Sequence, residues 1–145
     1  MRELPAQKTR QVVLLSCVKR KGRFRAKSQD LYESDLFRKS LGYAHSLAPD
    51  AIYILSAKYH LLDLHREIEP YDETLNAMGI AEVKDWANVV LRQLGEVADL
   101  SNDLFTFLAS ERYRRFLLPH LPNHKVPMQG LRIGQQLQFL KEQIG

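Results

Sequence analysis

Polar residues suited to ligand chemistry follow a short apolar run in the first half of the chain. Residues 53–55 are Tyr, Ile and Leu, and Ser56, Lys58 and Tyr59 come directly after them. An apolar, β-branched run of this kind predicts a strand that is buried on both faces. Ligands bind just past the carboxyl ends of strands in open α/β sheets, so these three polar residues stand where a binding site is expected.

A second polar group, residues 69–72, follows a few residues later and contains two carboxylates. We predict Asp72 and Glu69 as catalytic groups, because a carboxylate can stabilise a sugar cation and orient water. Lys58 suits a phosphate, and the rings of Tyr59 and Tyr71 suit a base. The alternatives are structural: turn chemistry for the carboxylates, a lysine that extends along the surface, and tyrosines that fill the core.

Positive charge is concentrated near the N-terminus, although the net charge of the chain is only +4. No acidic residue occurs between Lys8 and Asp30, and an aromatic residue lies inside the basic stretch. Aromatic residues among cations are typical of proteins that stack on bases, whereas the alternative is a solvated basic loop. The predicted nucleic-acid-binding residues are Lys19, Arg20, Lys21, Arg23, Phe24, Arg25 and Lys27.

Several further residues at predicted strand or helix ends are candidates for binding the substrate. Lys19 could also hold a phosphate, and Ser110 is a suitable N-cap whose helix end would favour an anion. The complete predicted substrate-binding set is Ser16, Cys17, Lys19, Lys58, Tyr59, Tyr71, Ser110, Tyr113 and Gln135. Cys17 ends an apolar run, so we expect it to be structural, with a nucleophilic role as the alternative.

The elements that would position these residues alternate between strands and helices. We expect an N-terminal arm over residues 1–10 and a single α/β domain over residues 11–145, with a mainly parallel, three- to four-stranded sheet and helices on both faces. Strands are predicted at 11–17, 51–56 and 103–108, with an edge strand at 125–128. Residues 28–32 are predicted to lead into a helix with apolar positions from Leu36 to Leu47. Further helices are predicted at about 80–97, after Ser110, and after Gly134.

Composition narrows the class of protein. The 145 residues, 45% of them hydrophobic and 26% charged, match one ordinary globular domain. No apolar run reaches the ~20 residues that span a membrane, and the N-terminus lacks the apolar core of a signal peptide. The single cysteine cannot form an intrachain disulfide, so we expect a cytoplasmic protein. The sequence contains no phosphate-binding loop, dinucleotide fingerprint or metal-ligand motif, and we expect no cofactor or metal.

Several segments, in order along most of the chain, resemble the YaaA-like superfamily. The most specific are residues 55–62 (LSAKYHLL) and 68–75 (IEPYDETL); others are residues 15–17 with the following basic residues, 30–37, 108–113 and 130–140. His60 stands where glycine is common in that superfamily, at a turn that would need a positive φ, which histidine tolerates better than most residues. The resemblance implies an α/β fold and a link to DNA or nucleotides.

These observations favour an enzyme acting on a nucleotide or nucleic acid, of an N-glycosidase or base-release type. One alternative is a non-catalytic DNA-binding protein of the YaaA-like kind that acts in damage or oxidative-stress protection. Another is an interaction module with a vestigial pocket. The acidic residues favour the enzyme, because carboxylates beside a cationic crevice would weaken simple binding to phosphate.

Overall fold

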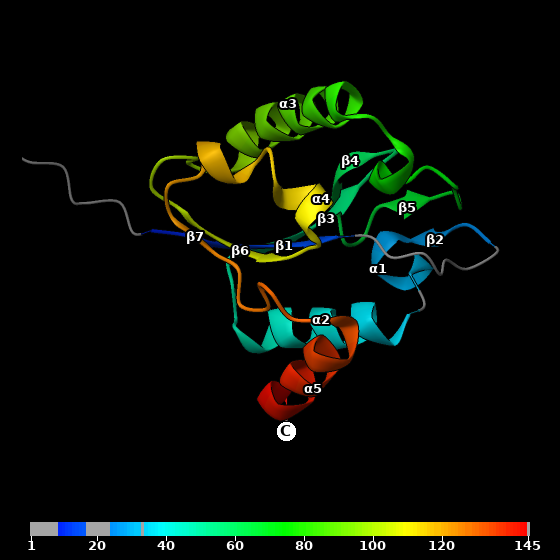
Figure 1. Cartoon of the computed structure of the whole chain (residues 1–145), viewed down its shortest axis with the longest axis vertical. Coiled ribbons are helices and arrows are strands. Elements are labelled where there is room, and N and C mark those ends of the chain that lie inside the picture. Colours follow the sequence, from blue (N-terminus) through cyan, green and yellow to red (C-terminus); the bar gives the residue numbers. More distant parts are fainter. Residues whose placement is uncertain (1–8, 17–23, 33, 145) are drawn as a thin grey trace, which may run out of the picture.

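A five-stranded sheet with strand order β4-β3-β1-β6-β7 forms the centre of the fold (Figure 1). The computed structural model describes residues 9–16, 24–32 and 34–144. Four strands run parallel, namely β1 (Gln11–Ser16), β3 (Ala51–Ser56), β6 (Leu104–Leu108) and β7 (His124–Lys125), and β4 (His60–Asp63) is antiparallel to β3. The mainly parallel α/β fold predicted from the sequence is confirmed, and β4 adds a strand that was not predicted.

The central strand β1 is covered on both faces, as its unbroken apolar sequence indicates. Val12 and Leu14 belong to the hydrophobic cluster on one face, and Val13 and Leu15 to the cluster on the other. All four side chains are at most 1% exposed. Because successive side chains of a strand point to opposite faces, this alternation places the two cores directly above and below β1.

The upper core lies under α3 (Ile80–Val97), which crosses the sheet in Figure 1. Its inward stripe is apolar at helical spacing, and Val83, Val90 and Leu94 are at most 2% exposed. Trp86 joins this helix to the sheet by a polar contact as well, since its Nε1 donates a hydrogen bond of 2.8 Å to the carbonyl oxygen of Ser56. The contact ties α3 to the carboxyl end of β3.

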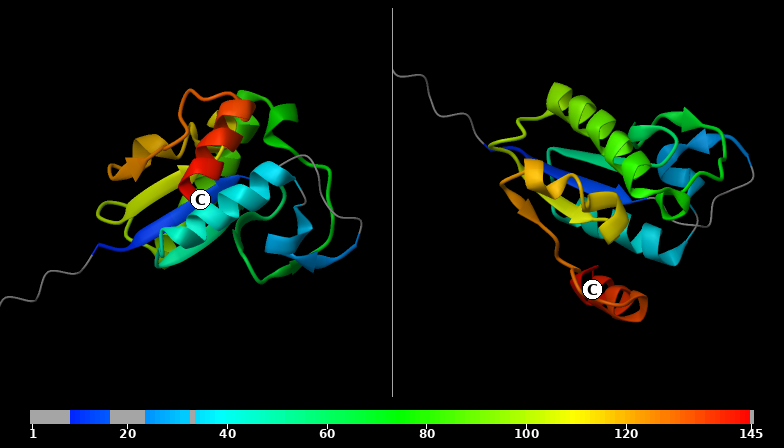
Figure 2. Two further views of the ribbon diagram at one scale, coloured as in Figure 1. Left: turned by 90° about the horizontal axis from the view of Figure 1, so that it is seen from below. Right: turned by 45° about the horizontal axis from the view of Figure 1, so that its top comes forward.

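The lower core lies above α2 (Asp35–Ser46), and α5 (Ile133–Ile144) packs against α2 (Figure 2). Ser34 begins α2 as its N-cap, with its Oγ accepting a hydrogen bond of 3.1 Å from the Phe37 N–H. Gly130 has a φ of 81°, a conformation that favours glycine, in the segment between β7 and α5. The expected helices on both faces are therefore present.

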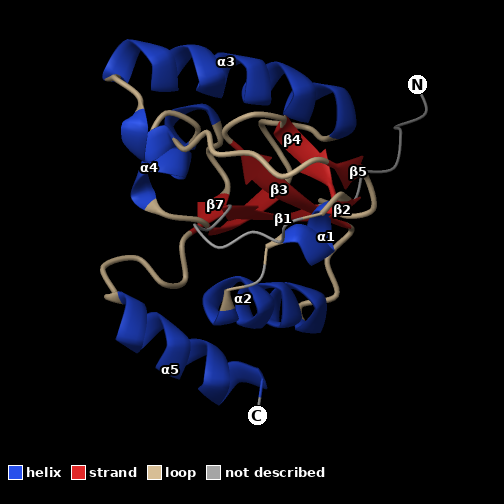
Figure 3. Ribbon diagram, turned by 90° about the vertical axis from the view of Figure 1, so that its right-hand side faces the viewer, coloured by secondary structure: helices blue, strands red, loops and turns tan. Residues whose placement is uncertain are grey.

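A small two-stranded ribbon lies beyond the carboxyl ends of β1 and β3 (Figures 1 and 3). It pairs β2 (Ala26–Lys27) with β5 (Glu67–Ile68) in antiparallel fashion, and α1 (Ser28–Leu31) follows β2. The first N–H groups of α1 are satisfied by the segment after β4, because Ser28 donates to the Arg66 carbonyl and Gln29 to the Leu64 carbonyl. This attachment holds the ribbon beside the sheet edge.

Three short helical segments complete the structure: η1 (Leu75–Ala77), α4 (Glu111–Arg114) and η2 (Leu118–His120). The residue before α4, Ser110, accepts backbone hydrogen bonds from Tyr113 and Arg114 but makes no side-chain cap bond. Ser110 therefore occupies the N-cap position as predicted, but its side chain does not cap the helix. The Ser110 N–H instead donates a hydrogen bond to Ser16 Oγ at the end of β1.

The ends of the domain agree in part with the sequence prediction. Arg10, assigned to the N-terminal arm, is attached to the domain: its N–H donates to Asp103 Oδ1 and its guanidinium donates to the Val97 carbonyl. Residues 1–8 lie outside the described part of the chain. Among the described residues, no helix has both the length and the apolar character required to cross a membrane.

Candidate functional site

Serine residues lie at the carboxyl ends of the three central parallel strands. Ser16 ends β1, Ser56 ends β3, and Ser110 follows β6. The N–H of Ser110 donates a hydrogen bond of 3.1 Å to Ser16 Oγ, which links the ends of β6 and β1. The structure therefore brings these predicted site residues to one edge of the sheet.

This edge is also where the connections diverge to opposite faces. The chain leaves β1 for α2, whose Phe37 lies in the lower core, and leaves β6 for α4, whose Tyr113 lies in the upper core. In open α/β sheets, the crevice at such a reversal is the usual place of ligand binding. Ser16 and Ser110 stand on either side of it.

A chain of buried hydroxyl groups extends from the end of β3. Ser56 Oγ donates a hydrogen bond of 2.8 Å to Tyr71 Oη, and Tyr71 Oη lies 2.5 Å from Tyr32 Oη. Ser56 Oγ also accepts a hydrogen bond of 3.0 Å from the Tyr59 N–H. Ser56, Tyr71 and Tyr32 are at most 6% exposed. These bonds fix Tyr71, and with it the start of the following segment, against the carboxyl end of β3.

Two cations flank the ring of Tyr59, which is half-buried beside this hydroxyl chain. The Tyr59 ring meets that of Tyr71 edge-on, with centroids 5.5 Å apart. Lys58 Nζ lies 5.5 Å, and Arg66 Cζ 5.3 Å, from the Tyr59 centroid. The predicted pair of Lys58 and Tyr59 thus lies together with Tyr71, and the second cation, Arg66, was not predicted. Cations held on an aromatic ring at a sheet edge can attract a phosphate.

His60 is the first residue of β4, directly after the turn from β3, and has a φ of 66°. The positive φ expected for this position is confirmed. The side chain is half-buried, and this burial lowers the pKa of His60 below its ordinary value because the charged imidazolium is less well solvated.

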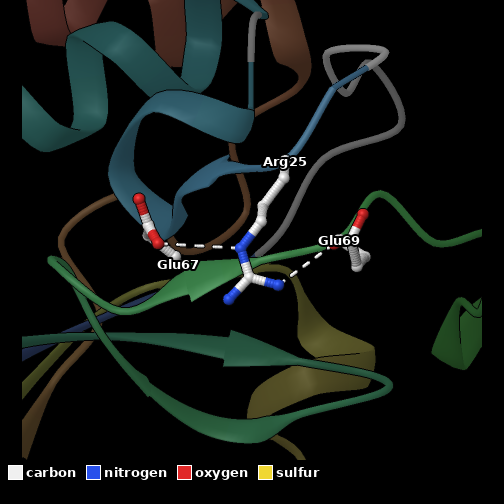
Figure 4. Close-up of polar contacts among 3 residues, drawn as sticks. All are labelled: Arg25, Glu67 and Glu69. Atoms are coloured by element: carbon white, nitrogen blue, oxygen red, sulfur yellow. Dashed lines mark hydrogen bonds and ion pairs between the residues drawn. The ribbon is translucent and has the colours of Figure 1, made fainter.

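The two predicted catalytic carboxylates have different surroundings. Glu69 Oε1 lies 3.1 Å from Arg25 Nη1, and Glu67 lies 3.6 Å from Arg25 Nε, so the guanidinium bridges the two acids across the ribbon (Figure 4). The hydrogen bond that Arg25 donates to Glu69 raises the pKa of Arg25. Asp72 follows the anchored Tyr71, is exposed, and forms no ion pair with the part of the chain that the structure describes. Of the two, Asp72 is therefore the carboxylate that remains open to a ligand.

Other predicted residues have structural contacts. Tyr113 is buried: its Oη accepts a hydrogen bond of 3.3 Å from the Leu75 N–H, and its ring packs edge-on against Trp86. Gln135 lies in the first turn of α5, where its Oε1 accepts a hydrogen bond of 2.9 Å from the Arg132 N–H. These contacts explain both residues without a ligand.

The predicted nucleic-acid-binding residues are only partly within the described structure. Phe24 is 82% exposed, and Arg25 and Lys27 are also exposed. The remaining predictions in this region lie outside the described residues: Cys17, Lys19, Arg20, Lys21 and Arg23.

A groove of about 350 Å³ lies on the α3 side of the sheet edge and was not predicted. Ser110 lines it, so it adjoins the crevice between β1 and β6. The groove is formed where α4 meets η1 and the start of α3. No local motif could have revealed it, because its walls come from segments far apart in the sequence. Tyr32 and Arg66 were missed for the same reason.

The fold and this edge define an α/β protein with a polar, tyrosine-rich candidate site at the carboxyl ends of the strands of a mainly parallel sheet. The chain belongs to a family of unknown function, DUF6884, whose model matches residues 12–142. Comparison with curated proteins and with solved structures finds no match. Among the described residues, no three His, Cys, Asp or Glu side chains are grouped so that they could hold a metal ion.

Proposed function

We propose that this protein acts on a nucleotide or nucleic acid and releases its base by hydrolysing the N-glycosidic bond. The observation that carries the proposal is the convergence at the sheet edge. There, Ser56 and Tyr71 are hydrogen-bonded, and Lys58 and Arg66 lie close to the Tyr59 ring. The exposed Asp72 is the residue after Tyr71. The resemblance of the sequence to the YaaA-like superfamily, with its link to DNA and nucleotides, agrees with this proposal.

The residue types match the needs of this reaction. Breaking the bond between the sugar carbon and the base nitrogen leaves positive charge on the sugar, which the carboxylate of Asp72 stabilises. Asp72 also orients a water molecule and accepts its proton as the oxygen bonds to the sugar carbon. The departing base takes up a proton from solvent. Glu69 has no part in this scheme, because it is paired with Arg25.

Binding in this scheme depends on the cations and the rings. Lys58 and Arg66 would hold the phosphate, since both are positioned by Tyr59. The hydroxyl chain of Ser56, Tyr71 and Tyr32 keeps the binding wall rigid, because each member is buried and hydrogen-bonded. A rigid wall places the sugar next to Asp72 without further ordering of the protein.

Base release from nucleotides and single-stranded DNA tests the proposal directly. Asp72→Asn keeps the shape of the side chain but not its charge, so turnover should fall by ~10²-fold or more. Glu73→Gln is the matched control: Glu73 is also exposed and is the next residue, so turnover should stay within about threefold of wild type. Base release by Asp72→Asn at the wild-type rate, or no base release by wild type from any of these substrates, would contradict the proposal.

A second candidate function, non-catalytic binding to DNA, is favoured by the exposure of Phe24. An aromatic side chain that is 82% exposed and followed by Arg25 and Lys27 suits stacking on an unpaired base. The pairing of Arg25 with Glu67 and Glu69 weakens this candidate, since it neutralises one of the cations.

Salt titration of DNA binding tests this second candidate. Replacing Lys19, Arg20, Lys21 and Arg23 with Ser should lower affinity for single-stranded DNA and reduce the slope of log K against log salt by ~0.7 for every phosphate that the protein no longer neutralises. Phe24→Ser should weaken binding without changing that slope, because stacking releases no counterions. If neither the Ser replacements nor Phe24→Ser changes the affinity for single-stranded DNA, this basic segment is not the DNA contact.

A further inference from the structure

We propose that the groove beside α4 binds a nucleotide that flanks the reacting one, so that the substrate is a single-stranded nucleic acid rather than a free nucleotide. This inference rests on the proposed function, because it assigns the polymeric form of the same substrate. It starts from the continuity between the groove and the candidate site, which meet at Ser110.

The groove combines apolar side chains with a cationic rim. Ile80, Val83 and Phe116 supply the apolar lining, and Ile80 is 55% exposed although it is a large hydrophobic residue. Arg115 Cζ and Lys84 Nζ lie 5.0 and 5.4 Å from the centroid of the Phe116 ring, so two cations are held at one aromatic side chain. Apolar surface next to positive charge suits an aromatic base joined to a phosphate.

The charges of the groove point to an anionic occupant. Arg112 is half-buried, and its guanidinium donates to two backbone carbonyls, those of Leu75, at 2.7 Å, and Met78. In the described part of the chain, no carboxylate forms an ion pair with Arg112 or Arg115. A guanidinium has five N–H donors, so Arg112 retains donors that the two carbonyls do not use.

Glu111 also lines the groove and offsets one of these cations. The lining cations Arg112 and Arg115, together with Lys84 beside the Phe116 ring, still exceed this single negative charge. Partial burial of a cation without a counter-charge is costly, and a bound phosphate would offset that cost.

Size and position favour one nucleotide of a longer strand over an isolated ligand. A volume of about 350 Å³ falls at the lower end of the range for small-molecule sites, which runs from ~300 to 1,000 Å³. The groove lies on the α3 side of the sheet edge, whereas Tyr71 belongs to the core on the other side. A strand with one nucleotide beside Tyr59 and Tyr71 could reach the groove past Ser110, which a mononucleotide could not do.

Binding of a fluorescein-labelled dT12 oligonucleotide, compared with competition by dTMP, tests the inference. The double variant Lys84→Ser/Arg115→Ser should weaken dT12 binding by about tenfold or more and reduce its log–log salt slope by ~0.7 for each phosphate left without a cation. Its affinity for dTMP should change less than about twofold. Arg92→Ser is the matched control, because Arg92 is an exposed cation on α3 that does not line the groove.

Three outcomes would overturn the inference. The first is that dT12 binds no more tightly than dTMP, and the second is that the double variant binds dT12 as wild type does. The third is that laurate, and not dT12, binds saturably in a way that depends on Lys84 and Arg115. The proposed function fails separately. If dT12 binds through the groove but loses no base, catalysis is refuted and the groove stands. If dTMP loses its base in an Asp72-dependent reaction while the double variant binds dT12 normally, the groove is refuted and catalysis stands.

Discussion

His60 has a left-handed backbone conformation, which few residues other than glycine adopt readily. Its φ of 66° lets the chain turn from β3 into β4, and the His60–Ser56 pair begins the antiparallel ladder between these strands. Histidine is among the residue types enriched in this conformation, whereas β-branched residues are strained there. A β-branched residue at this position would therefore strain the backbone.

The lowered pKa of His60 makes stability depend on pH. The unfolded chain, with an ordinary histidine pKa of ~6.5, binds a proton more readily than the folded chain. Protonation therefore favours unfolding, and the stability contributed by neutral His60 is complete above pH ~6.5 and is lost as the pH falls through the folded pKa.

His60→Asn should remove this part of the pH dependence, because asparagine tolerates the same φ but does not titrate. The difference between the melting temperatures of wild type and His60→Asn should shrink, or change sign, as the pH falls from 7.5 to 5. Curves that remain parallel over this range would show that burial of His60 does not control the effect.

At the scale of elements, the sequence predicted the strands and helices whose burial pattern is local. The predicted spans of β3 and α3 agree with the structure, because each has an apolar pattern bounded by polar or breaking residues. The short strands β2, β4 and β5 were not predicted. The two ribbon strands are only two residues long, and their pairing depends on contacts that no local pattern encodes.

The candidate site was predictable where it depends on strand ends and not where it depends on tertiary pairing. Ser56 and Tyr71 were expected at the edge of the sheet, and their hydroxyl groups are in contact. The ion pair that occupies Glu69 joins residues 44 positions apart, so it depends on the register of the ribbon. Glu69 was therefore predicted as a catalytic carboxylate, whereas in the fold it is paired with Arg25.

The contact between α3 and β3 gives a prediction for stability. Trp86→Phe keeps an aromatic ring in the upper core but removes the hydrogen bond from Nε1 to the buried end of β3. The unfolding free energy should fall by about 1–3 kcal/mol, since a buried carbonyl loses a partner and the smaller ring leaves space.

Urea denaturation would measure this loss, with Val97→Ala as the control. Val97 is a 39% exposed residue at the end of the same helix, and its truncation should cost less than about 0.5 kcal/mol. If Trp86→Phe is as stable as wild type, the Trp86 contact does not hold the carboxyl end of β3 in place.

For the whole molecule, the arrangement of layers explains why polar groups meet at a single edge. Helices cover both faces of the sheet, and the carboxyl ends of β1, β3 and β6 lie together at one border between these layers (Figure 3). The ribbon of β2 and β5 flanks this border, and the groove beside α4 adjoins it at Ser110. The opposite end of the sheet includes Asp99 and Asp103, whose carboxylates accept hydrogen bonds from backbone N–H groups.

The most direct test of a nucleotide site at this edge is a titration of the ¹⁵N-labelled protein with dAMP, followed by amide chemical shifts. We predict saturable shifts concentrated at the strand ends and the tyrosine cluster: Ser16, Ser56, Lys58, Tyr59, Tyr71, Asp72 and Ser110. Lys58→Met should weaken the apparent affinity by several-fold while the same amides respond. Shifts confined to the opposite end, around Asp99 and Asp103, or no saturable shift at all, would contradict the account.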